Sequence, residues 1–157
     1  MDFPVHIPFV ELLGLQLMGM GEGRAELRLP PRPEHQNSFH IPHGGVVMTV
    51  LDVVMAHAAR SLNVDGQGQH HGVVTIEMKT SFLQPGRGLL TARGEVLHHT
   101  ATLAFCEGRL HDETGACCAQ ATGTFKFLRG MAARDGNGRR QVHAPGPAEP
   151  LTGDGSD

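Results

Sequence analysis

The segment Gly44–Leu62 constrains the fold of this chain more than any other. It contains no proline, and its apolar residues recur at helical spacing: Val46, Val47, Val50, Leu51, Val54, Met55, Ala58, Ala59 and Leu62. A helix of this length spans about 28 Å. Met48, Val53 and Ala56 occupy positions where a surface helix would carry charged side chains. The segment therefore predicts a long helix that is buried nearly all round.

The residues before this helix predict a short helix and a β-hairpin. Pro8–Leu13 has the pattern of a short amphipathic helix that ends at Gly14. An extended piece begins at Leu15–Met18, and Arg24–Leu29 alternates strictly between apolar and charged residues. The Gly-rich stretch between the two pieces predicts a turn. Residues 30–42 contain several prolines and polar clusters and are expected to form a loop.

Four strands are predicted after the long helix. The first runs from Val74 to Phe82, and its alternation predicts a core face made of Val74, Ile76, Met78, Thr80 and Phe82. Turn residues then separate strands over Leu89–Leu97 and Ala101–His111, with Leu103 and Phe105 on one face of the latter. The last strand is expected to carry Cys117, Ala119, Ala121, Phe125 and Phe127 on its inner face.

These elements predict an α+β domain in which a curved antiparallel sheet wraps the long helix. The chain has 157 residues, enough for one such domain, which we place at residues 1–129. Residues 130–157 are rich in Arg, Asp, Gly and Pro and almost without large apolar side chains. A disordered polar tail is expected there.

Composition limits the class of function and the compartment. The formal net charge is −3 and the basic residues form no block, so nucleic-acid binding is not expected. The N-terminus lacks the regions of a secretory signal, and no apolar run approaches the roughly 18 residues of a membrane span. Three cysteines without a C-x-x-C spacing fit reduced thiols better than disulfides. We therefore expect a cytoplasmic protein without a membrane partner.

Asp52 is the only acidic residue in the long apolar helix. Burying an ionised carboxyl group is costly, and burial raises its pKa toward the range that suits a general base. An aspartate in this setting can also be structural, with hydrogen bonds to loop amides or to a second subunit. The residue type and setting alone leave both roles open.

The sequence His43-Gly44-Gly45 stands at the expected start of the same helix. Unpaired backbone N–H groups and the helix dipole favour negative charge there, so the oxyanion that forms from a thioester carbonyl would be stabilised. Two glycines before a helix are also common in loops that bind nothing.

Other catalytic arrangements are disfavoured. His35, His40 and His43 lie close together in one loop, but no zinc-ligand spacing is present, and no metal site is expected. Asp52 and His57 are five residues apart, about 140° around the helix, so His57 is expected to be structural. The sequence has no G-x-S-x-G motif and no dinucleotide fingerprint between a strand and a helix.

The segment Asn37–Asp52 resembles the signature of hotdog-fold thioesterases of the phenylacetate-degradation (PaaI-like) type. In that pattern an Asn precedes a His-Gly-Gly by six positions and an Asp follows the His by nine, as Asn37, His43 and Asp52 do here. The resemblance extends from Pro8 to Phe127. It includes the Ser-Phe-Leu-Gln-Pro end of the first long strand and the Asp-Glu-Thr-Gly hairpin.

The resemblance implies a hotdog fold and hydrolysis of an acyl-CoA, medium-chain or aryl, without a further cofactor. Asp52 would be the nucleophile or the general base, and the amide of Gly44 would polarise the thioester carbonyl. Asn37 and His43 would orient water or substrate, and Thr75, on the polar face of its strand, would be a further site residue. The resemblance also implies a homodimer with sites at its interface, in which Asp52 faces His43 of the other copy, and usually a homotetramer.

Two other functions remain as alternatives. One is a hotdog enoyl-CoA hydratase or dehydratase, which needs a His and a carboxylate at the substrate β-carbon. The other is an acyl-CoA-binding module without turnover. The family often has Gly and a basic residue where this chain has Thr100-Ala101, so a thioester carrier other than CoA also stays open.

Overall fold

The computed structural model describes residues 2–129, and the tail predicted at residues 130–157 lies outside the described residues. Two α-helices, a short 3-10 helix and six strands follow one another along the chain. They are α1 (Pro8–Leu13), β1 (Gln16–Gly21), β2 (Arg24–Leu29), η1 (Pro33–His35), α2 (Gly44–Leu62), β3 (Val73–Phe82), β4 (Leu90–His99), β5 (Leu103–His111) and β6 (Cys117–Phe127). The bounds of α1, α2 and β2 are those predicted from the sequence.

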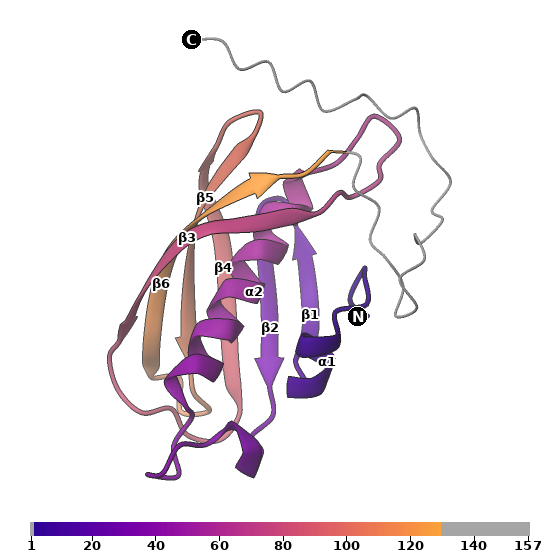
Figure 1. Ribbon diagram of the computed structural model, residues 1–157. Helices are drawn as coiled ribbons and strands as arrows, with labels where there is room; N and C mark the ends of the chain where they lie inside the picture. The colour runs from indigo at the N-terminus through magenta and orange to yellow at the C-terminus, as the bar shows by residue number, and fades with distance from the viewer. Residues whose placement is uncertain (1, 130–157) are drawn as a thin grey trace.

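The strands form one antiparallel sheet in the order β1-β2-β4-β5-β6-β3. The helix α2 crosses one face of this sheet, and α1 lies beside β1 at one edge (Figure 1). β3 follows α2 directly in the chain but pairs only with β6, so it forms the opposite edge. The α+β prediction of a curved sheet around one long helix is confirmed.

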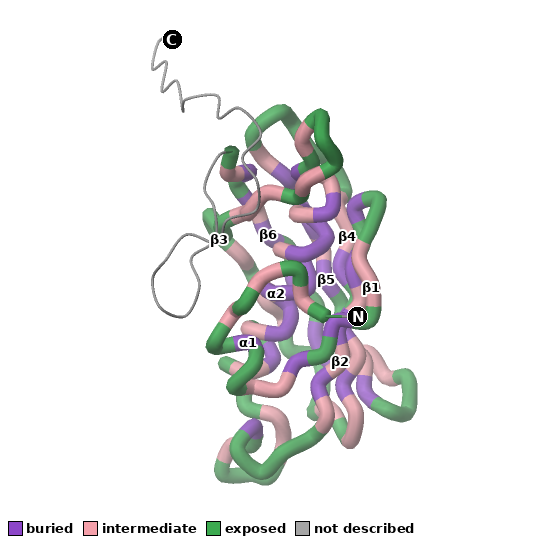
Figure 2. The backbone as a smooth tube through the Cα atoms, turned by 90° about the vertical axis from the view of Figure 1, so that its right-hand side faces the viewer, coloured by how far each residue is buried: buried purple, intermediate pink, exposed green. Residues whose placement is uncertain are grey.

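The core lies between α2 and the inner face of the sheet, where the buried residues gather along the helix and the central strands (Figure 2). Val50, Leu51, Val54 and Met55 of α2 are fully buried. By length and composition, with a mean hydropathy of 1.4, α2 could span a membrane, contrary to the sequence-based expectation. Half of that stretch is buried in the protein, however, and core helices commonly have this composition.

Glycines under α2 let the helix approach the sheet closely. A β-carbon at Gly94 of β4 would lie 2.8 Å from the carbonyl oxygen of Val54, and one at Gly108 of β5 would lie 3.1 Å from Met55 Cγ. Gly94 and Gly108 are cross-strand partners, so the two glycines form a shallow floor beneath the same part of the helix. The helix therefore packs against backbone rather than side chains there.

A β-bulge in β3 corrects part of the predicted core face of that strand: Met78, Thr80 and Phe82 lie on the helix side as predicted, but Val74 and Ile76 do not. Thr75 pairs with Phe125 and Glu77 pairs with Thr124, which leaves Ile76 as an extra residue. Because cross-strand partners share a face, Thr75 lies on the helix side with the buried Phe125, not on a polar outer face. Val74, the partner of Lys126, lies outside and is 42% exposed, and Ile76 is 56% exposed.

A second irregularity corrects the inner face predicted for β6. Leu110 pairs with Ala119 and His111 pairs with Cys117, so Cys118 is an extra residue and Cys117 lies on the outer face with His111. Leu103 and Phe105 share the outer face of β5, while the alternate residues of that strand, from Ala104 onward, are buried.

Candidate functional site

The centre of the site is a contact between the middle of α2 and the start of β3. The hydroxyl of Thr75 donates a hydrogen bond of 2.7 Å to Oδ1 of Asp52. The bulge at Ile76 makes this contact possible, because it directs Thr75 toward the helix while Glu77 points outward. The structure thus brings together two residues that the sequence analysis singled out separately.

Two influences act on the carboxyl group of Asp52. Burial beside the helix raises its pKa above the ordinary value, and the hydrogen bond from Thr75 acts in the opposite direction. The raised pKa makes Asp52 a stronger base than an exposed carboxylate. A carboxylate with this property, half-buried and held in one orientation, suits proton transfer from water.

The start of α2 is capped by His43. Its Nδ1 accepts a hydrogen bond of 2.9 Å from the amide of Gly45, and its carbonyl accepts one from the amide of Val47. Within residues 2–129 the amide of Gly44, the first residue of the helix, has no hydrogen-bond acceptor. That N–H lies where the helix dipole favours negative charge.

Asn37 organises the loop that leads into this helix start. Its Oδ1 accepts hydrogen bonds from the amides of Phe39 (2.9 Å) and Ile41 (3.4 Å). The backbone closes the same turn, because the amide of Asn37 donates to the carbonyl of Ile41. The loop includes His40 at a φ of 58°. In one copy of the chain, Asn37 therefore shapes the loop before His43.

The two parts of the site are too far apart to act on one carbonyl within a single chain. Gly44 and Asp52 are eight residues apart on α2, or about 12 Å along the helix axis. A general base and an oxyanion donor must both lie about 3 Å from the reacting group. The candidate residues thus form two separate groups, which we call the half-sites: Asp52 with Thr75, and His43 with Gly44.

One residue near the helix start was not assigned a role from the sequence. The ring of Phe82 lies 3.5 Å from the position that a β-carbon on Gly44 would occupy. Phe82 belongs to the Ser-Phe-Leu-Gln-Pro segment that contributes to the family resemblance, so that segment was the available signal. Only the structure places its ring against Gly44.

His57 takes no part in either half-site. Its Nδ1 lies 2.8 Å from the carbonyl oxygen of Val53, one turn earlier in α2, and its ring packs edge-on against Phe3. Burial is the main cause that lowers its pKa. These contacts agree with the expected structural role. Across residues 2–129, no group of three or more His, Cys, Asp or Glu side chains is arranged to hold a metal ion.

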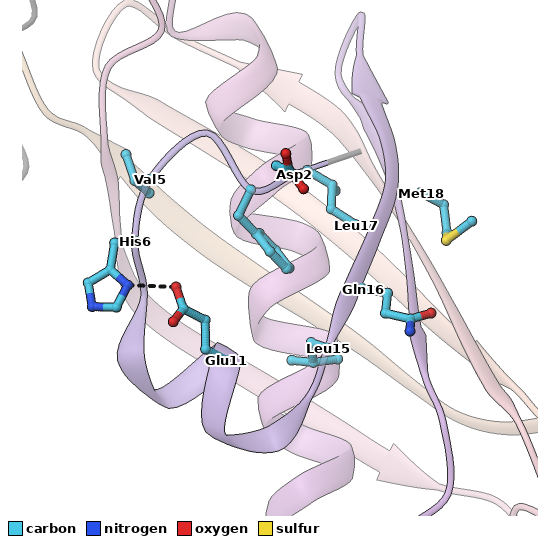
Figure 3. Close-up of a pocket in the computed structure, with 9 residues that line it drawn as sticks. Asp2, Val5, His6, Glu11, Leu15, Gln16, Leu17 and Met18 are labelled. Atoms are coloured by element: carbon cyan, nitrogen blue, oxygen red, sulfur yellow. Dashed lines mark hydrogen bonds and ion pairs between the residues drawn. The ribbon is translucent and has the colours of Figure 1, made fainter.

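Two cavities lie away from Asp52. One, of about 660 Å³, lies between the N-terminal segment and β1, and the ion pair of His6 with Glu11 (2.6 Å) is on its wall (Figure 3). The other, of about 770 Å³, lies along β1, β2, β4 and β5 and is lined by charged side chains such as Glu26 and Arg93. Neither cavity includes a residue of the two half-sites.

Comparisons with known proteins identify the family of the chain. The model of the thioesterase superfamily matches residues 39–119. The chain is 30% identical to the medium/long-chain acyl-CoA thioesterase YigI of Salmonella typhimurium, over 78% of this chain and 87% of YigI.

Solved structures give the same result for the fold. BH2602 of Bacillus halodurans, solved with CoA, has a TM-score of 0.71 and 28% identity, covering 82% of this chain and 83% of that one. The PaaI protein from the phenylacetic acid degradation operon of Escherichia coli also has a TM-score of 0.71. It is 21% identical and covers 80% of this chain and 87% of its own, a likeness that concerns the fold alone.

Proposed function

The chain belongs to the thioesterase superfamily and has the hotdog fold, and from this we propose that it hydrolyses an acyl-CoA to the free acid and CoA. The single observation that carries the proposal is the carboxyl group of Asp52, half-buried in an apolar helix, with raised pKa and a hydroxyl donor at 2.7 Å. Two comparisons support CoA as the carrier: YigI is an acyl-CoA thioesterase, and BH2602 was solved with CoA.

In the proposed reaction, Asp52 acts on the thioester carbon either directly or through water. As a general base it takes a proton from water, and the hydroxide oxygen bonds to the carbonyl carbon. The carbonyl oxygen becomes an oxyanion, which accepts a hydrogen bond from the amide of Gly44. The carbon–sulfur bond then breaks, and the proton held by Asp52 goes to the thiolate of CoA.

The same groups allow a covalent route. Asp52 would attack the thioester carbon and expel the CoA thiolate, and water would then hydrolyse the resulting mixed anhydride to acid and free Asp52. Both routes need Asp52 ionised and an N–H donor at the oxyanion. Thr75 holds Oδ1 of Asp52 in either case. CoA enters as part of the substrate, and neither route needs another cofactor.

We propose that two copies of the chain complete each site. The distance of about 12 Å between Gly44 and Asp52 on one helix supports this arrangement. In addition, β3 is an edge strand of the sheet formed by the described residues, so its outer side is open to pairing with another strand next to exposed Val74 and Ile76. Pairing of β3 with β3 of a second copy would place Asp52 and Thr75 of one protomer opposite His43 and Gly44 of the other.

Asn37 and His43 have supporting roles in this proposal. His43 holds the first turn of α2, so that the Gly44 amide keeps its direction, and Asn37 holds the loop before it. Both could orient the water or the substrate of the shared site. Assembly of two dimers into a tetramer and a cytoplasmic location are also proposed. The free thiols Cys106, Cys117 and Cys118 support that location.

A thiol-release assay with purified protein tests the proposal. Acetyl-, hexanoyl-, decanoyl-, phenylacetyl- and benzoyl-CoA are each mixed with the enzyme, and free CoA is measured with a thiol reagent. We expect saturable release from at least one of them. If none is hydrolysed while CoA esters still bind, the chain is an acyl-CoA-binding module or acts on another carrier, and the proposed reaction is wrong.

A further inference from the structure

A stripe of three residues on α2 faces the edge strand β3. Gly44, Met48 and Asp52 are spaced by four, so they follow one another along the same side of the helix. Gly44 lies against Phe82 at one end of β3, and Asp52 bonds Thr75 near the other end. Met48 lies midway between them and therefore faces the same strand. The surface between the two half-sites therefore carries the apolar side chains of Met48 and Phe82.

Phe82 is held in a defined place at the end of this line. It pairs with the buried Ala119, so its side chain lies on the helix side of the sheet. The amides of Leu83 and Gln84 both donate to the carbonyl of Cys118, at 2.8 and 3.2 Å, which anchors the backbone just after it. Phe82 nevertheless stays 55% exposed, because β3 is an edge strand.

Exposed apolar surface in this position needs a reason. Phe82 and Met48, which is 38% exposed, leave apolar area in water beside the Gly44 N–H, which we propose as the oxyanion donor. When a thioester carbonyl accepts a hydrogen bond from the Gly44 N–H, its carbonyl carbon lies close to Phe82, and an apolar group attached to that carbon can contact the ring. That group is the acyl chain, the part of the substrate that gains most from an apolar wall.

We propose that Phe82 is the residue that selects the acyl group, with Met48 as the adaptable surface beyond it. The selected class is acyl-CoA with an extended apolar acyl chain, in preference to acetyl-CoA. This inference rests on the proposed function. The unbranched Met48 side chain adjusts to chains of different length, whereas the anchored aromatic ring contacts the carbons nearest the carbonyl.

The experiment measures kcat/KM for acetyl-CoA and decanoyl-CoA with the wild type, Phe82→Ala and Phe82→Leu. The matched control is Leu12→Ala, which removes an exposed apolar side chain from α1, away from both half-sites. We expect the decanoyl-to-acetyl ratio of kcat/KM to fall roughly tenfold in Phe82→Ala, because an apolar contact with the longer chain is lost. Phe82→Leu should lie between the two, and Leu12→Ala should keep the wild-type ratio.

The outcomes separate this inference from the function on which it rests. An unchanged ratio in a folded, active Phe82→Ala variant overturns the selection role and leaves the hydrolysis intact. An equal loss for both substrates, accompanied by dissociation of the oligomer, assigns Phe82 to the contact with a second copy and also overturns it. Absence of hydrolysis by the wild type rejects the proposed function, and the inference with it.

Discussion

At the scale of single residues, the proposed function depends on two influences on the carboxyl group of Asp52, its burial and one hydrogen bond. Burial raises its pKa, and the hydroxyl of Thr75 partly offsets that rise by stabilising the ionised form. Burial therefore strengthens Asp52 as a base, while the hydrogen bond favours its ionised form. An apolar residue at position 75 would neither orient the carboxyl group of Asp52 nor lower its pKa.

Thr75→Val should move the acidic limb of the pH–rate profile to higher pH. The variant keeps the shape of the side chain but removes the hydroxyl donor that lowers the pKa of Asp52. At a given acidic pH, Asp52 is then protonated in a larger fraction of the molecules. Thr75→Ser, which keeps the hydroxyl, should retain the wild-type limb. The measurement is kcat/KM across pH 4–8. If the pH–rate profiles of Thr75→Val and the wild type coincide, Thr75 does not affect the pKa of the catalytic group and is not a site residue.

Asp52→Asn should stabilise the folded protein at neutral pH but not in acid. The folded-state pKa of Asp52 lies above that of the unfolded chain, so the folded state binds the proton more tightly. The free energy of unfolding therefore falls as pH rises from the unfolded pKa, near 3.8, through the folded one. Asparagine does not ionise, so the free energy of unfolding of Asp52→Asn does not fall for this reason.

Urea unfolding of both proteins below and above that window measures the difference. We expect the midpoint of Asp52→Asn to exceed that of the wild type only at the higher pH. A higher wild-type midpoint at neutral pH would mean that the ionised carboxyl group is stabilising, contrary to its burial in an apolar helix.

At the scale of elements, the packing of α2 on the sheet decides where the two half-sites lie. Gly94 brings β4 against the backbone of the helix at Val54, two residues after Asp52. The sequence pattern predicted the bounds of α2 correctly, because an apolar helix without proline between two polar loops has few alternatives. It did not predict the outward turn of Val74 and Ile76, because a single extra residue in β3 reverses the alternation and leaves no signal in the pattern.

Gly94→Ala should destabilise the domain by about 1–3 kcal/mol, the usual cost of overpacking. The new methyl group would lie 2.8 Å from the carbonyl oxygen of Val54, and the helix backbone cannot yield as a flexible side chain can. Gly19→Ala is the control, since a β-carbon there meets nothing within 4 Å. Thermal and urea unfolding compare the two variants, and equal stability would show that α2 does not rest on Gly94.

At the scale of the whole molecule, the proposed site is formed by two chains. The residues of each half-site could be identified from the spacing of Asn37, His43 and Asp52. Their separation into two groups could also be foreseen, because Gly44 and Asp52 share one helix. The proposed acyl-binding surface could not, since it depends on the contact of Phe82 with Gly44 between segments far apart in sequence.

Mixed dimers should recover activity from two inactive variants. Gly44→Pro removes the N–H donor, and proline is tolerated at the first position of a helix. Asp52→Asn removes the base. In a heterodimer one site keeps Gly44 from one chain and Asp52 from the other, while the second site loses both. Gly44→Ala, which keeps the N–H, should stay active as a homodimer.

The mixing experiment uses differently tagged chains, refolded together and purified through both tags. Thiol release by the heterodimer, with neither homodimer active, is the expected result. Verified heterodimers without activity would place the complete site within one chain and reject the shared arrangement.

The most direct test of the central claim is kcat/KM of Asp52→Asn for the best acyl-CoA substrate, measured in protein whose oligomeric state and folding match the wild type. If Asp52 is the base or nucleophile, the value should fall by at least about 100-fold, the lower range for loss of a proton-transfer group. Asparagine keeps an oxygen that can accept the hydrogen bond from Thr75, so the geometry of the contact is preserved while the chemistry is removed. A value within about threefold of the wild type would contradict the account, because the thioester would then be hydrolysed without the carboxyl group on which the mechanism depends.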